Sequence, residues 1–183
     1  MVAERGRPEQ RQALLAGAVE HVLRHGASGL SLRPLAAALG TSDRMLLYYF
    51  SSREHLLETV LDLIGDGLLA ALSDTVPPGR HHPDVLLRQL WSVARDPHVE
   101  PRLRLYVEIL GQSAAQVAPF PAAAQRVAAR WLDWAQERVD VPVDQRAETA
   151  AALLATLDGL LILDLAIGSD IADRAARQLL RQD

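Results

Sequence analysis

Two short helical patterns separated by a single glycine restrict the fold of this chain more than any other feature of its 183 residues. The first pattern is an apolar stripe at helical spacing, made of Leu32, Leu35, Ala36 and Leu39. Gly40 is a good C-terminal stop for this helix, and Thr41 or Ser42 can cap a second helix that runs to about Tyr49. Two short helices joined by such a turn have the outline of a helix-turn-helix.

The rest of the sequence also follows a helical period. Ala and Leu dominate, aromatic residues make up only 4% of the chain, and no useful stretch alternates as a strand does. Gly and Pro residues separate further helices, which we predict at about 8–25, 53–72, 83–95, 102–117, 121–138, 144–167 and 170–181. The sequence therefore predicts an all-α protein of about nine helices, with an N-terminal three-helix helix-turn-helix domain ahead of a larger helical domain.

Patterns typical of enzymes and metal sites are missing from the sequence. The chain has no cysteine, which excludes disulfides and thiolate metal ligands. Its 6 histidines show no HExxH or similar ligand spacing, Ser113 lacks a GxSxG elbow, and there is no Gly-rich phosphate loop. We therefore expect no catalytic residue, no metal and no cofactor.

Charge is distributed unevenly along the chain, and all 19 basic residues are arginine. Residues 1–56 carry seven Arg and five acidic residues, a balance of +2, and the remainder carries twelve Arg and eighteen acidic residues, a balance of −6. The net charge of −4 argues against a non-specific nucleic-acid coat protein. A basic segment on an acidic body suits a sequence-specific DNA binder.

The most apolar run, Ala150–Ile167, approaches the length that spans a bilayer. It contains Asp158 and Asp164, which are costly in lipid, so we interpret it as a helix buried in protein. No charged-then-apolar segment opens the chain, and the lack of cysteine fits a reducing compartment. We expect a cytoplasmic protein with no membrane partner.

Residues 31–57, SLRPLAAALGTSDRMLLYYFSSREHLL, resemble the DNA-binding signature of the TetR family of transcriptional regulators. The matching positions lie in the turn, the recognition helix and the start of the next helix: Gly40, Ser42, Leu46, Tyr49, Phe50, Arg53, Glu54 and Leu56. The family's usual first tyrosine is Leu47 here, with Tyr48 following it, and Asp43 stands where a basic residue is frequent. The resemblance covers about residues 8–57. It implies a homodimer that binds palindromic double-stranded DNA and is released by a small molecule.

A recognition helix needs one anchored face and one exposed face, because only the major groove admits a helix and distinguishes every base pair. Leu46 and Phe50, four residues apart, can anchor it. The residues left to face DNA are Thr41, Ser42, Arg44, Met45 and Tyr48, and Arg44 can make a bidentate contact with guanine. We expect phosphate contacts from Ser31, Arg33 and Arg53. Arg5, Arg7 and Arg11 form either a basic arm or a solvated terminus.

The last two predicted helices offer surfaces for a second chain. The helix at 144–167 is apolar nearly all round from Ala150, so it needs cover on both sides, and the helix at 170–181 keeps an apolar stripe. Together they predict a four-helix-bundle dimer interface, which the resemblance also implies, with contacts from Leu157, Leu161, Ile171 and Leu179. The alternative is that 144–167 is the central core helix of a monomer.

Aromatic residues are concentrated in the middle of the sequence, where TetR-like proteins hold an effector. We expect a pocket for a hydrophobic or aromatic small molecule, lined by Trp91, Tyr106, Glu108, Trp131 and Trp134. The alternative is that each aromatic residue is an ordinary core residue.

These patterns together predict a sequence-specific DNA-binding regulator, a repressor released from a palindromic operator by an effector. Residues 1–52 would form the DNA-binding domain, and residues 53–183 would bind the effector and form the dimer. The alternative is an all-helical protein-interaction module that does not bind DNA. Salt-dependent binding to a defined palindrome distinguishes the two, because a phosphate binder releases counterions.

Overall fold

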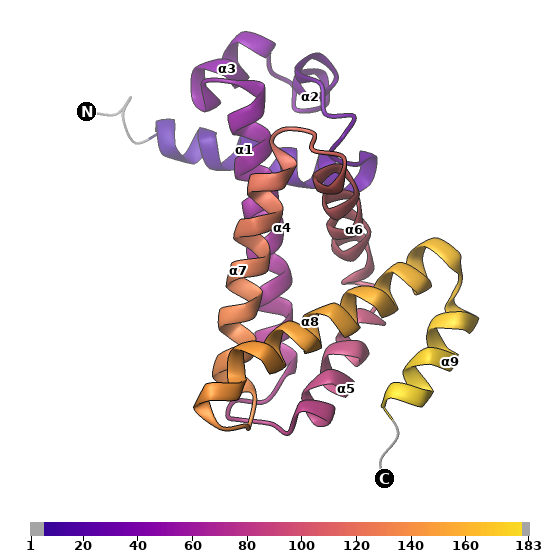
Figure 1. The fold of residues 1–183 in the computed structure, drawn as a ribbon. Helices are drawn as coiled ribbons and strands as arrows, with labels where there is room; N and C mark the ends of the chain where they lie inside the picture. The colour runs from indigo at the N-terminus through magenta and orange to yellow at the C-terminus, as the bar shows by residue number, and fades with distance from the viewer. Residues whose placement is uncertain (1–5, 181–183) are drawn as a thin grey trace. The chain divides into compact units, whose positions relative to one another are not determined.

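The computed structural model describes residues 6–180, and within them the chain is all-helical with no strand, as the sequence predicts (Figure 1). These residues contain nine α-helices: α1 (Gly6–His25), α2 (Leu32–Ala38), α3 (Asp43–Phe50), α4 (Arg53–Thr75), α5 (Pro83–Ala94), α6 (Glu100–Ala114), α7 (Phe120–Arg138), α8 (Arg146–Ile162) and α9 (Ser169–Leu179). Helix α6 begins before Pro101 and not after it, because a proline is tolerated in a first turn, where its missing N–H has no helical partner.

The predicted helix at 144–167 consists of three consecutive segments. A 3-10 turn, Val143–Gln145, leads into α8, and a π-helical segment, Leu163–Ile167, follows it before Gly168 starts the turn to α9. Gly168 has φ +144°, a conformation that side-chain-bearing residues rarely adopt. The chain can therefore reverse direction sharply between α8 and α9.

The described chain forms two compact units. One, the head unit, combines the residues up to Asp66 with Glu108–Ala124, and the other, the body unit, combines Gly67–Val107 with the residues from Gln125 onward. Helices α4, α6 and α7 each contribute residues to both units. Neither unit is therefore a continuous stretch of sequence.

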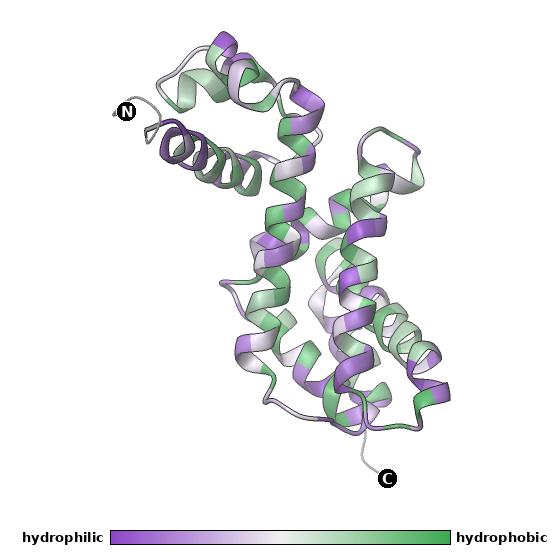
Figure 2. Ribbon diagram, turned by 90° about the vertical axis from the view of Figure 1, so that its left-hand side faces the viewer, coloured by the Kyte–Doolittle hydropathy of each residue, from purple (hydrophilic) through white to green (hydrophobic). Residues whose placement is uncertain are grey.

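Hydrophilic and hydrophobic residues alternate around most of the helices, as Figure 2 shows. Helix α8 departs from this pattern, because both of its faces are apolar. One face is buried in the body unit through Leu153, Leu157, Leu160 and Leu161. The other face, which includes Ala152, Ala155, Gly159 and Ile162, is exposed. A single chain therefore leaves one face of its most apolar helix exposed to solvent.

Val143–Ile167 is the one helical stretch among the described residues that is long and apolar enough to cross a membrane, by length and composition alone. The two charged residues in its apolar run, Asp158 and Asp164, both have partners inside the body unit. Arg95 forms an ion pair with Asp164, and the Tyr106 hydroxyl donates a hydrogen bond of 3.2 Å to Asp158. These contacts fit a helix that packs against protein.

The Asp158 carboxyl is destabilised as an anion by its surroundings. Burial raises the pKa of Asp158 to about 6, and the hydrogen bond from Tyr106 offsets this only in part. Because the folded-state pKa is raised, the protein is most stable with respect to this group below the unfolded-state pKa, where the carboxyl is protonated in both states. The free energy of unfolding falls as the pH rises through the folded-state pKa and the buried carboxyl ionises.

Replacement of Asp158 by Asn should therefore stabilise the protein at neutral and alkaline pH. We expect the free energy of unfolding of Asp158→Asn to exceed that of the wild type by about 1–2 kcal/mol at pH 8, and the difference to shrink towards pH 5. Urea denaturation at both pH values measures this. Asp164→Asn is the matched control, because it breaks the ion pair with Arg95 and should destabilise the protein at both. Equal destabilisation by Asp158→Asn at both pH values would contradict the assignment.

Candidate nucleic-acid interface

The turn between α2 and α3 is a Schellman motif. The Gly40 N–H bonds to the Ala37 carbonyl at 3.3 Å, and the Thr41 N–H bonds to the Ala36 carbonyl at 2.9 Å. Gly40 has φ +62°, in the left-handed region that the motif requires at this position. Glycine adopts this conformation easily because it has no Cβ. The hydrogen bonds satisfy carbonyls at the end of α2 and fix the direction in which α3 begins.

Helix α3 starts with a side-chain cap, and α2 does not. The Ser42 hydroxyl accepts a hydrogen bond of 3.3 Å from the Met45 N–H, which confirms the predicted cap. Ser31 has the extended backbone of a cap residue, but its side chain makes no capping bond. The Ser31 hydroxyl is therefore not committed to the helix, and this exposed residue lies at the N-terminus of α2.

One face of α3 is fully anchored in the head unit. Leu46 and Phe50 are 0% exposed, as predicted from their spacing, and so is Leu35 on α2. Helices α1 and α2 also approach closely, because a Cβ on Gly17 would lie 2.4 Å from a methyl carbon of Leu39. Only glycine at this position leaves room for Leu39 as it is placed.

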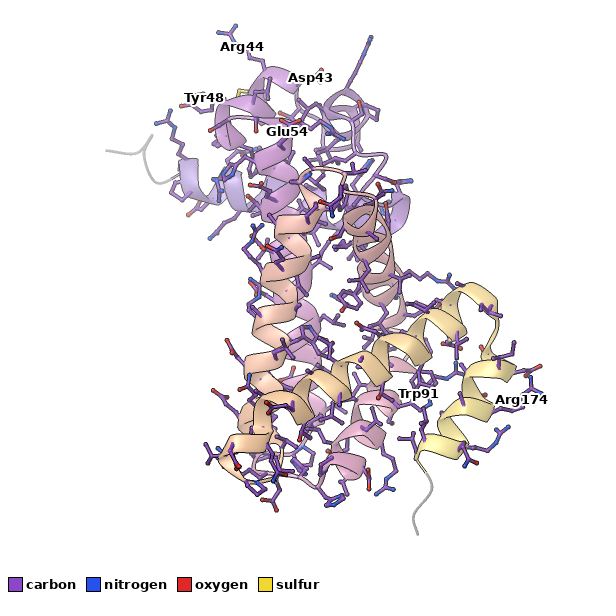
Figure 3. All side chains as sticks on the ribbon, in the orientation of Figure 1. Asp43, Arg44, Tyr48, Glu54, Trp91 and Arg174 are labelled. Atoms are coloured by element: carbon purple, nitrogen blue, oxygen red, sulfur yellow. The ribbon has the colours of Figure 1, made fainter. Side chains whose placement is uncertain are left out.

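The opposite face of α3 is open to solvent. Ser42, Arg44, Met45 and Tyr48 are exposed, which confirms their predicted orientation, while Thr41 is half-buried. In Figure 3 the Arg44 side chain points away from the rest of the head unit. Leu47 is exposed on the same helix, at 40%, although its apolar character suggests no such role.

Acidic side chains lie beside this open face. Asp43 is in the first turn of α3 and Glu54 is in the first turn of α4, positions where a negative charge stabilises the helix dipole (Figure 3). The same charges repel phosphate. The open face is therefore positive at Arg44 and not uniformly positive.

Two arginines of α1 stack on the aromatic rings at the end of α3. The Arg7 guanidinium lies 4.7 Å from the centre of the Tyr48 ring, and the Arg11 guanidinium lies 5.0 Å from that of Phe50. An open groove of about 520 Å³ lies beside them and is lined by Arg7, Pro8, Arg11, Tyr48 and Tyr49. Arg7 and Arg11 are thus part of a helix and not of an arm, and Arg5 lies outside the described residues.

Arg53 has a structural partner. Its Nε–H donates a hydrogen bond of 2.7 Å to the Leu30 carbonyl, and a terminal nitrogen lies 3.7 Å from Glu54. Arg53 therefore ties the start of α4 to the segment before α2, with part of its guanidinium still exposed. Arg33 is exposed on α2.

Glu108 has a different role from the predicted one. Its carboxylate accepts hydrogen bonds from the Ala27 N–H at 3.1 Å and from the Ser28 N–H at 2.7 Å. These amides follow Gly26, whose φ is +83° and whose Cβ, if it had one, would lie 3.1 Å from a Glu108 oxygen. Glu108 thus holds the end of α1 in the head unit and is not available as a pocket residue. No local sequence signal could have revealed a contact across 81 residues.

The predicted aromatic pocket residues are all buried in the body unit, on three successive helices. Trp91, Tyr106, Trp131 and Trp134 are between 6% and 9% exposed. The Trp134 indole N–H donates to the Ser73 hydroxyl at 2.9 Å, and the Arg95 guanidinium lies 5.7 Å from the Trp91 ring centre.

The predicted dimer contacts divide into two groups. Leu157 and Leu161 are each 2% exposed in the single chain, so they are core residues of the body unit and cannot meet a partner. Ile171 and Leu179 are 38% and 53% exposed. The side chain next to Leu161 along α8, Ile162, is 43% exposed and has the orientation that the sequence predicts for Leu161.

Comparisons with known proteins agree with this geometry. The profile of the family described as bacterial regulatory proteins, tetR family, matches residues 14–60. No curated protein matches the sequence.

The whole chain resembles solved structures of regulators. A transcriptional regulator from Rhodococcus sp. is 20% identical with a TM-score of 0.71, and the match covers 93% of each chain. A TetR transcription regulator from Haloarcula marismortui is 16% identical with a TM-score of 0.70, covering 94% of this chain and 95% of that one. The multidrug binding protein EbrR, complexed with imidazole, is 24% identical with a TM-score of 0.65, covering 96% and 92%. Residues 14–60 thus match the tetR family of bacterial regulatory proteins, and over nearly its whole length the chain has the fold seen in solved structures of TetR transcription regulators.

Proposed function

We propose that this protein is a homodimeric transcriptional repressor that binds a two-fold symmetric DNA site and is released by a small molecule. The observation that carries the proposal is α3, a short helix with one face buried by Leu46 and Phe50 and the other open at Arg44. Residues 1–52 are the proposed DNA-binding domain and residues 53–183 the effector-binding and dimerisation domain. We place the protein in the cytoplasm and assign it no catalytic role.

Base reading is assigned to the exposed face of α3. Arg44 has the length and the paired donors to bind the O6 and N7 atoms of guanine in the major groove. Met45, Ser42 and the half-buried Thr41 lie on the same side or at the cap, where they can contact neighbouring base edges. Specificity therefore depends on few side chains, with Arg44 dominant.

Phosphate contacts are assigned around the edges of this face. Stacking on Tyr48 fixes the plane of the Arg7 guanidinium while its N–H edges stay free to donate. The Tyr48 hydroxyl is carried on a ring that is 54% exposed. Together they form the proposed main phosphate contact, and Ser31, Arg33 and the exposed part of Arg53 add to it. Such contacts position the protein without selecting a sequence.

The dimer is assigned to the exposed apolar faces of α8 and α9. Ile162 and Ile167 are 43% and 62% exposed, and Ile171 and Leu179 extend the surface onto α9. A Cβ on Gly159 would meet no atom within 4 Å, so the middle of this face is open to a second helix. A second copy of the chain would cover the apolar surface and bring two recognition helices into one complex.

Release by an effector is assigned to the body unit. EbrR, whose fold this chain shares, is a multidrug binding protein with a structure in complex with imidazole, which supports a small-molecule role for this fold. We propose that Trp91, Tyr106, Trp131 and Trp134 line a pocket for a hydrophobic or aromatic ligand. A ligand that binds one of two states better shifts the population towards it. Reading of both half-sites needs recognition helices about 34–36 Å apart, so a small change in spacing releases the DNA.

An all-helical protein-interaction module without DNA binding is the second candidate. No specific contact in the described part of the head unit favours it over DNA binding, and the exposed Arg44 with its capped and anchored helix favours DNA.

Arg44→Ala should weaken specific DNA binding and relax base preference at one position in each half-site. We expect a loss of about 1–3 kcal/mol in binding free energy, because one bidentate guanine contact disappears. Selection of bound sequences from a random DNA pool, for wild type and variant, measures both effects. Arg24→Ala, an exposed arginine on α1, is the control that should leave the selected motif unchanged. If the wild type enriches no motif at moderate salt, the DNA-binding proposal fails.

Arg7→Ala and Tyr48→Phe should weaken binding to all sequences alike, but with different salt dependence. Loss of Arg7 should lower the slope of log K against log salt concentration by about one, because one fewer counterion is released. Tyr48→Phe keeps the stacked ring and removes only a neutral donor, so affinity should fall about tenfold with the slope unchanged. Titrations of one DNA duplex at several salt concentrations test this, with Arg24→Ala, an exposed arginine at the other end of α1, as the control that should change neither affinity nor slope. Unchanged affinity in both variants would show that this pair faces away from DNA.

Ile162→Asp and Leu161→Asp should have different effects, although the residues are adjacent: the first should disrupt assembly and the second folding. Ile162→Asp should give a folded monomer, because the new charge lies in the proposed interface. Leu161→Asp should unfold the protein, because an unpaired charge in the core costs several kcal/mol. Sedimentation velocity and circular dichroism separate the two outcomes. A folded Ile162→Asp dimer with the affinity of the wild type would move the interface elsewhere.

A further inference from the structure

The two carboxylates in the apolar part of α8 and the π-segment have different surroundings. Asp164 is paired with the Arg95 guanidinium, which also lies 3.9 Å from Asp173 and 3.5 Å from the Ser169 hydroxyl. Asp158, six residues earlier, has no such cation among the described residues: its Oδ2 atom accepts the hydrogen bond from the Tyr106 hydroxyl. The burial of Asp164 is thus compensated by charge, and that of Asp158 is not.

The second oxygen of Asp158 has no partner at all within residues 6–180. Its Oδ1 atom is buried and accepts no hydrogen bond. A carboxylate oxygen has two lone pairs, and leaving a charged acceptor buried and unpaired is costly, so such groups usually have a partner in the working state of a protein. Burial raises the pKa of Asp158 to about 6, so at pH 7 the group is still mostly an anion.

Other polar atoms in the core of the same unit also lack partners. The Trp131 indole N–H and the Gln89 side-chain oxygen are buried without a hydrogen bond among the described residues. Tyr106, which orients Asp158, is 7% exposed on α6. The body unit therefore combines buried aromatic rings with one uncompensated negative charge.

We propose that the Asp158 carboxylate, oriented by the Tyr106 hydroxyl, is the counter-ion for a cationic group on the effector. The ligand class is an aromatic or apolar frame that carries a protonated amine, an amidinium or a quaternary ammonium. A cation supplies what Oδ1 lacks, and aromatic rings favour a cation over a neutral group of the same shape. This inference rests on the proposed effector-binding function and narrows the chemistry of its ligand.

The test uses three ligands with the same ring system and different charges: 2-naphthamidine, 2-naphthamide and 2-naphthoate. Isothermal titration calorimetry on the full chain measures their affinities. The amidinium should bind about tenfold or more tightly than the neutral amide, and the carboxylate should not bind, because only the cation pairs with Asp158. Asp158→Asn should reduce the affinity for the amidinium to that for the amide and leave the affinity for the amide unchanged.

Asp164→Asn is the matched control, since it removes the same charge from the same stretch of helix and should keep the preference for the cation. Tyr106→Phe should keep the preference too, because it removes the orienting hydroxyl and not the charge. Circular dichroism confirms that each variant is folded. A preference that survives Asp158→Asn, equal binding of amide and amidinium, or no binding of the amidinium would each overturn the inference.

A separate measurement distinguishes this failure from failure of the proposed function. Release of the selected DNA site is followed for every ligand that binds. If the neutral amide binds and releases DNA as well as the amidinium does, effector control stands and the role of Asp158 is wrong. If the amidinium binds through Asp158 and DNA stays bound, the site stands and release by such a ligand is wrong.

Discussion

The candidate nucleic-acid interface depends on the backbone conformation of Gly40. A positive φ at this residue allows the two hydrogen bonds that close the Schellman turn, and those bonds set the angle at which α3 leaves α2. With that angle fixed, Leu46 and Phe50 enter the core and Arg44 is turned outward. A side chain at this position would strain the turn, and the anchoring and exposed faces of α3 would no longer meet core and solvent.

Helix α8 shows a second constraint, the excess of apolar surface over what one chain can bury. Leu153, Leu157 and Leu161 are covered inside the body unit, while Ile162 and the small residues beside it are exposed. An exposed apolar surface of this kind is typical of an interaction site. The two carboxylates on the same stretch have different partners: Asp164 pairs with Arg95, and Asp158 is hydrogen-bonded only to Tyr106. The proposed dimer surface and the proposed ligand contact thus lie on adjacent parts of the same helical stretch.

Local signals in the sequence were sufficient for the helices and for the orientation of α3. Capping residues, glycine stops and apolar periods lie within a few positions of one another, so Ser42, Gly40 and the buried pair Leu46 and Phe50 could be predicted. The period also indicated that α8 needs cover on two sides. It could not tell which of Leu161 and Ile162 points inward, because a helix that is apolar all round has no polar face to mark the solvent side.

Contacts between distant segments could not be predicted in the same way. Stacking of Arg7 on Tyr48 and the bond from Arg53 to the Leu30 carbonyl depend on how helices meet in space, and neither leaves a periodic trace. The proximity of Glu108 to Ala27 and Ser28 is of the same kind. Its aromatic neighbours in the sequence suggested a pocket, whereas its carboxylate is occupied by backbone amides.

The position of Glu108 has a consequence for the modularity of the protein. The head unit receives this carboxylate from a segment that the ribosome makes long after the helix-turn-helix, and a fragment that ends at Asp66 lacks it. In such a fragment the Ala27 and Ser28 N–H groups would donate to water, and the segment between α1 and α2 would lose its hydrogen bonds to the carboxylate. A chimaera that transfers this DNA-reading end to another regulator therefore has to transfer the Glu108 segment with it, or supply a glutamate at the equivalent turn of the recipient's own helix.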